Sequence, residues 1–253
     1  MKFIGIIPAR YASTRFPAKP LAMLGGKPVI QRVYEQVAGV LDEAYVATDD
    51  ERIEEAVKAF GGKVVMTSVN HKSGTDRCYE AFTKVGQGCD VIVNIQGDEP
   101  LLEPATIKAA IEPFYHNPDL QISNLMAKIT DPIDVVNCTV PKVITNRDGI
   151  GVYLTRATAP YPKGSLDYAY YKQVCVYGFK PEALQFYCDY GMTYGKAKVE
   201  AVEDIEILRF IENGYKVQYI EVDSETVAVD TPNDLQKVRA IVEAKIAAGE
   251  ITI

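Results

Sequence analysis

The stretch FIGIIPARYASTRFPAKP, residues 3–20, decides the fold that this sequence is expected to adopt. Its first five residues, Phe3–Ile7, are almost all large and apolar and end at Pro8. This pattern is typical of a buried parallel strand that opens into a loop. Ligands of α/β proteins bind beyond the carboxyl ends of such strands. We therefore expect the loop Pro8–Pro20 to bind a ligand.

The loop carries three cations, Arg10, Arg15 and Lys19, although the chain has a formal net charge of -7. Small residues between the cations let the backbone approach a ligand, so that N–H groups and guanidinium groups can share a phosphate chain. These small residues are Ala9, Ala12, Ser13 and Thr14. The pattern favours a triphosphate over a single carboxylate, and a basic surface loop is the alternative. Neither a P-loop motif nor the glycine motif of dinucleotide sites is present.

Strand and helix patterns alternate over about the first half of the chain. Such alternation predicts a mostly parallel sheet with right-handed crossovers. The residues Gly25–Pro28 predict a turn before the first helix. The predicted strands are Phe3–Ile7, Ala44–Ala47, Lys63–Met66 and Asp90–Ile95, and the predicted helices are Val29–Val40, Glu51–Phe60, Thr75–Val85 and Pro104–Phe114.

The region Ile122–Gly195 interrupts the alternation and predicts a β-rich insert. Its tyrosines suit either an amphipathic interface or solvent-exposed loops. The strands predicted in this region are Ile122–Ile129, Lys142–Ile144, Gly151–Leu154 and Gln173–Phe179. Beyond it, two helices are predicted over Glu203–Glu212 and Pro232–Ala248, with the strand Val217–Glu221 between them.

Two aspartates follow predicted strands. Asp98 comes after the strand Asp90–Ile95 and after Gly97, which lets a ligand approach. An acid in this position suits a hard cation such as Mg²⁺, although it could also begin a turn and cap the next helix. Asp230 lies between the apolar run Val227–Val229 and the last predicted helix. There the role of an N-cap is a sufficient explanation.

Length and composition limit the class of protein. The 253 residues can form one large α/β domain or two small ones, and no linker divides them. The five cysteines form no C-x-x-C pair, which disfavours a disulfide framework or a zinc knuckle. The net negative charge and the absence of a basic tail disfavour nucleic acid as a partner. With no apolar run long enough for a membrane span and no signal peptide, we expect a cytoplasmic protein.

Five sequence blocks carry a resemblance to a known family. They are IIPARYASTRFPAKPL at 6–21, VATDD at 46–50, HKSGTDR at 71–77, NIQGDEP at 94–100 and VDTPNDL at 229–235. In this order they resemble the 3-deoxy-manno-octulosonate cytidylyltransferases, also called CMP-Kdo synthetases. The resemblance implies that CMP is transferred from CTP to the anomeric hydroxyl of the sugar acid Kdo, with Mg²⁺ required. The products would be pyrophosphate and CMP-Kdo for lipopolysaccharide biosynthesis.

The resemblance also implies a fold and an assembly. The fold is a mostly parallel, Rossmann-like nucleotide-diphospho-sugar transferase sheet with helices on both faces and a β-rich insert. We expect one nucleotidyltransferase domain over residues 1–253, in which 130–195 form a sugar lid and a dimerisation segment. The assembly implied is a homodimer.

Individual residues acquire expected roles from the same blocks. The expected catalytic residues are Arg10, Arg15, Lys19, Asp98 and Asp230, and the last two are the expected metal ligands. The expected nucleotide-binding residues are Ala9, Arg10, Ser13, Thr14, Arg15, Lys19, His71, Ser73, Gly74, Thr75, Arg77 and Gln96. The expected sugar-binding residues are Gln96, Lys142, Arg156, Gln173, Tyr177 and Glu206.

Two departures from the family pattern concern the sugar. Gln173 stands where the family form H-x-G-x-Y-G has histidine, and Ile207 stands where L-E-Q-L-R has glutamine. Both replacements reduce hydrogen-bonding capacity for a polyhydroxylated anion. They keep open a related keto sugar acid as substrate, such as 8-amino-Kdo or a sialic-acid-like sugar. A nucleotide-binding regulator without catalysis is the second alternative.

Overall fold

The computed structural model describes residues 1–12, 15–165, 167–223 and 227–251, which pack as two compact units. Unit 1 comprises Met1–Ile107 and the described residues from 227 onward, and unit 2 comprises 108–223. Helices and strands occur in both units, so the prediction of an α/β fold is confirmed.

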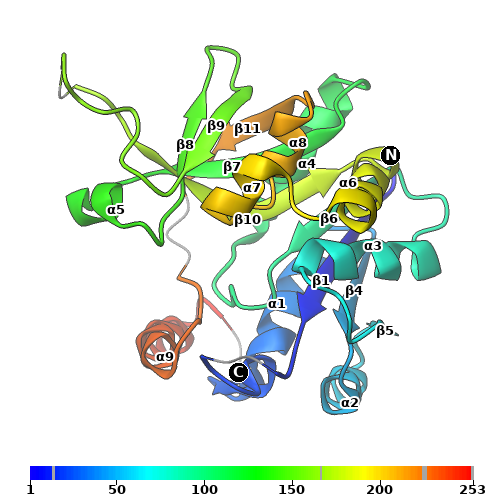
Figure 1. Ribbon diagram of the computed structural model, residues 1–253. Helices are drawn as coiled ribbons and strands as arrows, with labels where there is room; N and C mark the ends of the chain where they lie inside the picture. The colour runs from blue at the N-terminus through cyan, green and yellow to red at the C-terminus, as the bar shows by residue number, and fades with distance from the viewer. Residues whose placement is uncertain (13–14, 166, 224–226, 252–253) are drawn as a thin grey trace. The chain divides into compact units, whose positions relative to one another are not determined.

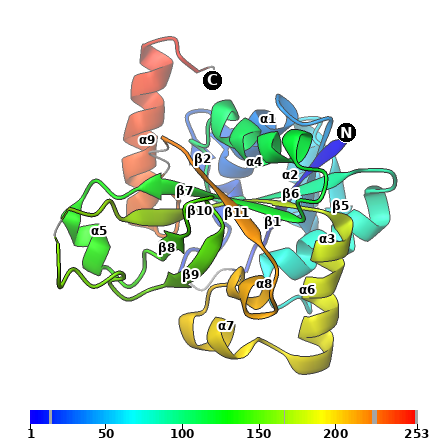
Figure 2. The same ribbon diagram turned by 90° about the horizontal axis from the view of Figure 1, so that it is seen from above.

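Unit 1 is built on a parallel sheet with the strand order β6-β1-β4-β5. Its strands are β1 (Phe3–Ala9), β4 (Glu43–Thr48), β5 (Val64–Met66) and β6 (Val91–Ile95), and the helices between them are α1 (Val29–Ala38), α2 (Glu51–Ala59) and α3 (Gly74–Val85). The strands of this sheet lie side by side in Figure 1. Figure 2 shows α1 and α2 on one face of the sheet and α3 on the other. The predicted alternation of strands and helices is therefore confirmed.

Strand β1 extends two residues beyond its predicted end. Its pairing with β4 continues as far as Ala9, whereas its pairing with β6 ends at Ile6. Pro8, which has no N–H to donate, therefore interrupts no ladder with β6. As a result the end of β1 projects beyond the end of its pairing with β6, and the cationic loop begins there.

The C-terminal helix α9 (Pro232–Ala247) packs on the hairpin of β2 (Met23–Leu24) and β3 (Lys27–Pro28). Gly25 and Gly26 turn this hairpin with φ of 55° and 84°, values that glycine adopts without steric cost. The apolar cluster beneath the helix consists of Leu24, Val29, Val229, Leu235, Val238 and Val242. This cluster holds the segment before α9 at the same edge of unit 1 as the cationic loop.

Unit 2 contains the predicted β-rich insert, with β11 parallel to β7 and β10 antiparallel to β7. Strands β8 and β9 continue from β10 as an antiparallel pair. Its strands are β7 (Ile122–Lys128), β8 (Lys142–Thr145), β9 (Gly151–Thr155), β10 (Tyr171–Phe179) and β11 (Val217–Glu221), and its helices are the end of α4 (Pro104–His116), α5 (Pro132–Val136), α6 (Pro181–Tyr194), α7 (Lys198–Glu203) and α8 (Leu208–Glu212). Helix α4 covers one face of β7, β10 and β11, and α6, α7 and α8 cover the other (Figure 2).

Helix α6 was absent from the sequence-based prediction, which assigned strands and loops to the whole region 122–195. Pro181 occupies the first helical turn, a favourable position for proline. The buried residues Ala183, Leu184, Tyr187 and Cys188 follow helical spacing. The tyrosines of the helix range from the buried Tyr187 to the exposed Tyr194, so the apolar face was hard to recognise in the sequence.

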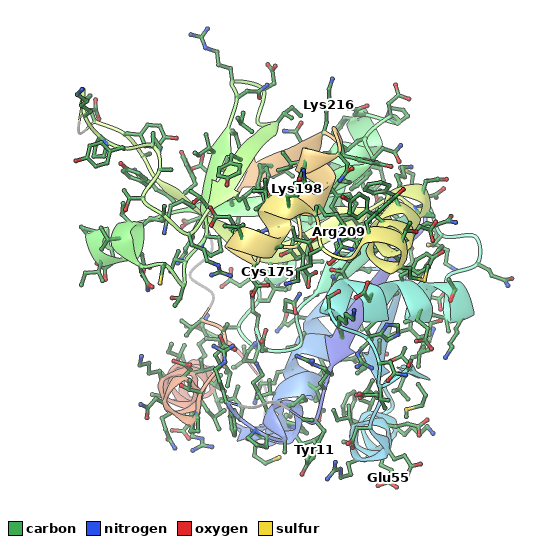
Figure 3. All side chains as sticks on the ribbon, viewed as in Figure 1. Tyr11, Glu55, Cys175, Lys198, Arg209 and Lys216 are labelled. Carbon is green, nitrogen blue, oxygen red and sulfur yellow. The ribbon has the colours of Figure 1, made fainter. Side chains whose placement is uncertain are left out.

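The single helix predicted over Glu203–Glu212 is wrong, because the chain turns at Asp204 between α7 and α8. Asp204 adopts a left-handed conformation with φ of 52°. The turn lets Glu200 of α7 form a two-pronged ion pair with Arg209 of α8, with both distances at 2.7 Å. Arg209, labelled in Figure 3, also stacks its guanidinium 3.7 Å from the ring centre of Tyr187. This buried ion pair fixes the angle between the two short helices.

All five cysteines are free thiols, and Cys138 is exposed. Among the described residues, none of the helices combines the length and the apolar character that crossing a membrane requires.

The close packing of β1 against α1 gives a testable prediction. A Cβ atom at Gly5 would lie 2.3 Å from Cγ1 of Val37 and 2.9 Å from Cδ1 of Leu41. We expect Gly5→Ala to lower the free energy of unfolding by about 1 to 3 kcal/mol, the usual cost of overpacking a core. Urea unfolding followed by circular dichroism measures this change.

Gly164→Ala is the matched control. Its added Cβ would meet no atom within 4 Å, so its midpoint of unfolding should stay near that of the parent protein. Equal midpoints for the two variants would contradict the packing described for β1.

Candidate functional site

A cleft with a volume of about 200 Å³ opens in unit 1 at the carboxyl ends of β1 and β6. Four segments that are distant in the sequence form its wall: the loop after β1, the start of α3, the loop after β6 and the residue before α9. The lining residues are Pro8, Ala9, Arg10, Arg15, Lys19, Pro20, Ser73, Gly74, Arg77, Gln96, Gly97, Asp98 and Asp230. Most of the residues predicted from the first, third, fourth and fifth sequence blocks thus meet at one place.

Lys19 is the central charge of the cleft. Its Nζ lies 2.7 Å from Oδ2 of Asp98 and 3.4 Å from Oδ1 of Asp230. Arg15 reaches the same Oδ1 of Asp230 with its Nη2 at 3.0 Å. Two carboxylates so close to each other would repel without a cation between them. The cations therefore hold the two acids in place.

Arg10 adds a positive charge that no described residue balances. Its side chain lines the cleft, it is exposed, and it forms no ion pair with any residue that the structure describes. Together the lining residues carry more cations than acids. The cleft is therefore suited to an anion, and the guanidinium groups suit phosphate oxygens in particular.

Arg77 forms the buried side of the cleft and is only 1% exposed. Its Nη1 donates to Oγ1 of Thr67 at 2.5 Å, and its Nη2 lies 3.2 Å from Oδ2 of Asp49. That Nη2 atom is buried and completes no hydrogen bond of good geometry within the described structure. The guanidinium is thus held rigidly and retains an unused donor next to the cleft.

The first turn of α3 contributes a second positive feature. Ser73 caps the helix by accepting a hydrogen bond from the N–H of Asp76 at 3.0 Å. A Cβ atom at Gly74 would lie 3.3 Å from Cγ of Pro8, and one at Gly97 would lie 3.0 Å from the carbonyl oxygen of Pro8. The absence of side chains at these glycines lets the backbone approach the loop after β1. The amino end of a twelve-residue helix carries partial positive charge that favours an anion.

The metal role predicted for Asp98 and Asp230 fits the geometry of the cleft, because both carboxylates converge on one cation. The helix cap at α9 is not Asp230 but Thr231, whose Oγ1 accepts from the N–H of Asp234 at 3.2 Å. Within the described ranges no group of three or more His, Cys, Asp or Glu side chains is arranged to hold a metal ion. A metal at the two aspartates would therefore need further ligands, such as phosphate oxygens or water.

Two of the predicted nucleotide-binding residues, His71 and Thr75, lie away from the cleft lining. His71 contacts Glu80, and Thr75 is buried and accepts a hydrogen bond from Nδ2 of Asn94 at 3.3 Å. Burial raises the pKa of Glu80, but hydrogen bonds from Lys84, the N–H of Ser68 and His71 outweigh it and lower that pKa to about 2. The remaining two, Ser13 and Thr14, lie outside the described residues.

Lys142 and Arg156, expected to bind the sugar, organise a loop of unit 2. Nζ of Lys142 donates to the carbonyl oxygens of Asn137, Val140 and Arg156 at 2.8 to 2.9 Å. Burial lowers the pKa of Lys142. The guanidinium of Arg156 donates to backbone carbonyls as well, including that of Glu203 at 2.6 Å. A sugar contact by Lys142 would require it to exchange one of these three bonds, and its role in binding stays a prediction.

Of the other expected sugar-binding residues, Gln96 lines the cleft of unit 1, and the rest lie in unit 2. Gln173 and Tyr177 are on β10, Gln173 half-buried and Tyr177 9% exposed, and burial raises the pKa of Tyr177 well above its usual range. Glu206 is half-buried in the turn before α8. Ile207, the second departure from the family pattern, is 1% exposed and belongs to the apolar core.

Sequence reasoning missed the residues that support the site. Asp49 and Thr67 hold Arg77, and the repeated aspartates of VATDD were the signal for the first of them. Asn124, which contacts Gln173, had no sequence signal, because a single asparagine in a strand shows no pattern.

Comparison with known proteins places the chain among cytidylyltransferases. The model of a family described as cytidylyltransferase matches residues 4–221. A 3-deoxy-manno-octulosonate cytidylyltransferase of Bacteroides thetaiotaomicron is 52% identical over 93% of this chain and 96% of that protein. One of Phocaeicola vulgatus is 50% identical over 97% of this chain and 99% of that protein.

A solved structure resembles the chain over nearly its full length. It is a CMP:2-keto-3-deoxy-manno-octonic acid synthetase complexed with CTP, with a TM-score of 0.90 and 37% sequence identity. The match covers 97% of this chain and 100% of that chain. The fold predicted from the sequence, a mostly parallel nucleotide-sugar transferase sheet, is thereby confirmed.

The excess of cations in the cleft gives a prediction about anion binding. We expect Arg15→Ala to weaken the binding of inorganic triphosphate by about 1.5 to 3 kcal/mol, the range for hydrogen bonds to charged groups. Alanine cannot reproduce a two-pronged guanidinium contact with phosphate. Isothermal titration calorimetry with the folded variant measures the loss.

Lys58→Ala serves as the control, since Lys58 is an exposed cation on α2 that pairs with Glu54 and does not line the cleft. Its triphosphate affinity should equal that of the parent protein. An unchanged affinity for triphosphate in Arg15→Ala would contradict a role of Arg15 in binding the anion.

Proposed function

This chain belongs to the 3-deoxy-manno-octulosonate cytidylyltransferase family, and we propose that it transfers CMP from CTP to the anomeric hydroxyl of Kdo. The products are CMP-Kdo and pyrophosphate, and the activated sugar serves lipopolysaccharide biosynthesis. The observation that carries the proposal is the cleft of unit 1, in which the cations of the loop after β1 lie beside two converging aspartates.

The cations of the cleft are placed to bind the phosphates of CTP that leave as pyrophosphate. The sugar hydroxyl loses its proton to water and its oxygen forms a bond to the α-phosphorus of CTP, while the bond from that phosphorus to the oxygen bridging to the β-phosphorus breaks. Negative charge accumulates on the phosphate oxygens as this occurs. Arg10 and Arg15, with Lys19, are positioned to bind the β- and γ-phosphates and to stabilise the pyrophosphate that leaves. The amino end of α3 adds a partial positive charge to these cations.

We propose Mg²⁺ as the cofactor, held by Asp98 and Asp230. Their carboxylates already converge on the ammonium group of Lys19, so the donor set suits a hard cation. Two acids in a cleft for phosphates would otherwise oppose substrate binding by like-charge repulsion. When bound, Mg²⁺ would offset phosphate charge and lower the pKa of the attacking hydroxyl. The two histidines of the chain, His71 and His116, are both paired with glutamates, which accords with a mechanism that needs no histidine base.

A second candidate substrate follows from Gln173. The family pattern has histidine at this position, and a neutral amide recognises a different set of groups from an imidazole. A keto sugar acid altered at the end that meets β10, such as 8-amino-Kdo, is therefore the alternative substrate. The regulator without catalysis has less support, because the aspartates and the cations of the cleft are all present.

We also propose a homodimer that forms through residues 130–195. Several large apolar side chains of this segment are exposed, among them Ile133, Val136 and Tyr161 at 69%, 71% and 80%. Exposed apolar side chains gathered in one segment favour a protein partner. The expectation of a cytoplasmic protein remains part of the same proposal.

The two aspartates provide the first test. We expect Asp98→Asn and Asp230→Asn each to lower kcat/KM roughly 100-fold or more, as the loss of one electrostatic group in an active site does. Stability should change little at position 230, because Thr231 caps α9. Pyrophosphate release with CTP, Kdo and saturating Mg²⁺ measures the activity.

Asp119→Asn makes the same change of charge on an exposed loop and should retain full activity. Near-normal turnover in both Asp98→Asn and Asp230→Asn would refute the metal role of these residues.

The choice of sugar is tested by comparing Kdo with 8-amino-Kdo. We expect kcat/KM to be at least as high for Kdo, because the cleft and the sequence blocks match the family. A value for the amino sugar that is more than about tenfold higher, or about 1.4 kcal/mol of discrimination, would make the amino sugar the substrate. Steady-state kinetics at fixed CTP concentration decides between them.

A further inference from the structure

Asn124 is the centre of a hydrogen-bonded cluster that joins β7 and β10 of unit 2. It lies on β7 and is fully buried, with 0% of its surface exposed. Its Nδ2 donates to the carbonyl oxygens of Val174 and Val176, each at 2.9 Å. Its Oδ1 accepts a hydrogen bond from Nε2 of Gln173, also at 2.9 Å. One side chain of β7 thus contacts three residues of β10.

The two carbonyl oxygens that Asn124 contacts lie where β10 bulges away from regular pairing with β7. Pairing with β7 passes from Val174, opposite Leu125, directly to Tyr177, opposite Asn124, so the register of the β7–β10 pair shifts between them. The Cys175 label in Figure 3 marks the position of the bulge. A buried carbonyl group without a hydrogen bond is costly. The amide nitrogen of Asn124 donates to both carbonyl oxygens and so holds β10 at the register shift.

This arrangement fixes the orientation of two amide groups in succession. The nitrogen of Asn124 must face the two carbonyl oxygens, since only the nitrogen can donate. The oxygen of Asn124 therefore faces Gln173 and can only accept. Gln173 must in turn present its nitrogen to Asn124, which leaves its own Oε1 on the other side of the amide. That oxygen accepts no hydrogen bond from any described residue of the chain.

We propose that Asn124 and Gln173 form a specificity pair that presents a single acceptor oxygen to the sugar acid. Gln173 is the residue that contacts the substrate, and Asn124 is a positioning residue that acts through it. The pair selects a keto sugar acid with a hydrogen-bond donor, a hydroxyl or an ammonium group, where the sugar meets β10. This inference rests on the proposed function, because the sugar-binding role of position 173 comes from the family.

The chemistry differs from that of the histidine in the family pattern. An imidazole can donate from one nitrogen when neutral and from both when protonated, so it can serve sugar groups that only accept. The amide of Gln173 has one N–H bonded to Asn124, so its Oε1 is held in a fixed direction as an acceptor that no described residue occupies. A group that cannot donate, such as an ether or fluorine, leaves this half-buried oxygen without a partner. The replacement at position 173 therefore changes which substituents the site accepts.

The first experiment couples substrate changes to a change at Gln173. Kdo derivatives in which one hydroxyl at a time is replaced by fluorine keep the size of the sugar but lose one donor. In each protein, kcat/KM for a derivative is divided by kcat/KM for Kdo. For one derivative, we expect this ratio to be about tenfold lower in the parent enzyme than in Gln173→Met. The KM for CTP should be the same in both proteins. Equal relative rates for every derivative in the two proteins would overturn the proposal.

Gln218→Met is the matched control, since Gln218 is a half-buried amide on β11 that donates to the carbonyl oxygen of Asp148. Its profile over the fluorinated sugars should equal that of the parent enzyme. A control that loses the same discrimination would show that any amide of this sheet affects the sugar, and would contradict the role of Gln173.

The second experiment tests whether Asn124 acts through Gln173. Asn124→Leu should raise the KM for Kdo about tenfold and leave the KM for CTP unchanged. In the Gln173→Met background the same change should have little further effect on the KM for Kdo. Additive effects, or a loss of kcat with both KM values unchanged, would indicate a structural role alone.

A measurement on the parent protein remains decisive where Asn124→Leu does not fold. The side-chain amide protons of Asn124 and the Nε2 proton of Gln173 that is bonded to Asn124, assigned by nuclear magnetic resonance, should exchange slowly with solvent. Rapid exchange of both Nε2 protons of Gln173 would show that its nitrogen faces the solvent, and would overturn the pair.

The outcomes also separate this inference from the proposed function. Turnover of Kdo without any coupling to Gln173 would leave the proposed function in place and reject the specificity pair. No turnover of any keto sugar acid with CTP would reject the proposed function and, with it, the role of the pair.

Discussion

Asp98 and Asp230 can occupy the same cleft only because a cation stands between them. Lys19 fills this place, and its contacts join the loop after β1, the loop after β6 and the segment before α9. The backbone reinforces the connection, since the N–H of Val229 donates to the carbonyl oxygen of Asp98 at 2.8 Å. The site of unit 1 is thus formed by segments from both ends of the chain. A cation must lie between Asp98 and Asp230 to offset the repulsion between their carboxylates.

Unit 2 depends on buried polar groups of a different kind. Arg209 and Glu200 fix two short helices, and Asn124 fixes the bulge of β10. Each group is buried and has its hydrogen bonds satisfied, so each specifies one arrangement of the backbone around it. The cleft of unit 1 carries charges for phosphate, whereas unit 2 presents uncharged amide chemistry at Gln173. This division accords with a reaction in which the nucleotide is constant and the sugar acid is selected.

The parallel sheet of unit 1 could be predicted almost completely, because each buried strand and each amphipathic helix carries its own local pattern. Helix α6 and the break at Asp204 could not. The aromatic residues of α6 range from buried Tyr187 to exposed Tyr194, and the break at Asp204 is stabilised by an ion pair between Glu200 and Arg209. Such tertiary contacts override the local preference of the chain.

The sequence by itself determined the family, the cationic loop and the identity of the two aspartates, since these lie in contiguous blocks with a definite chemistry. Without the family resemblance the residues favoured a helix cap for Asp230, and only the structure assigned that cap to Thr231. The orientation of Gln173 was likewise decided by tertiary structure. An amide has no preferred direction until a neighbour provides one, and here Asn124, 49 residues away in the chain, provides it across the sheet.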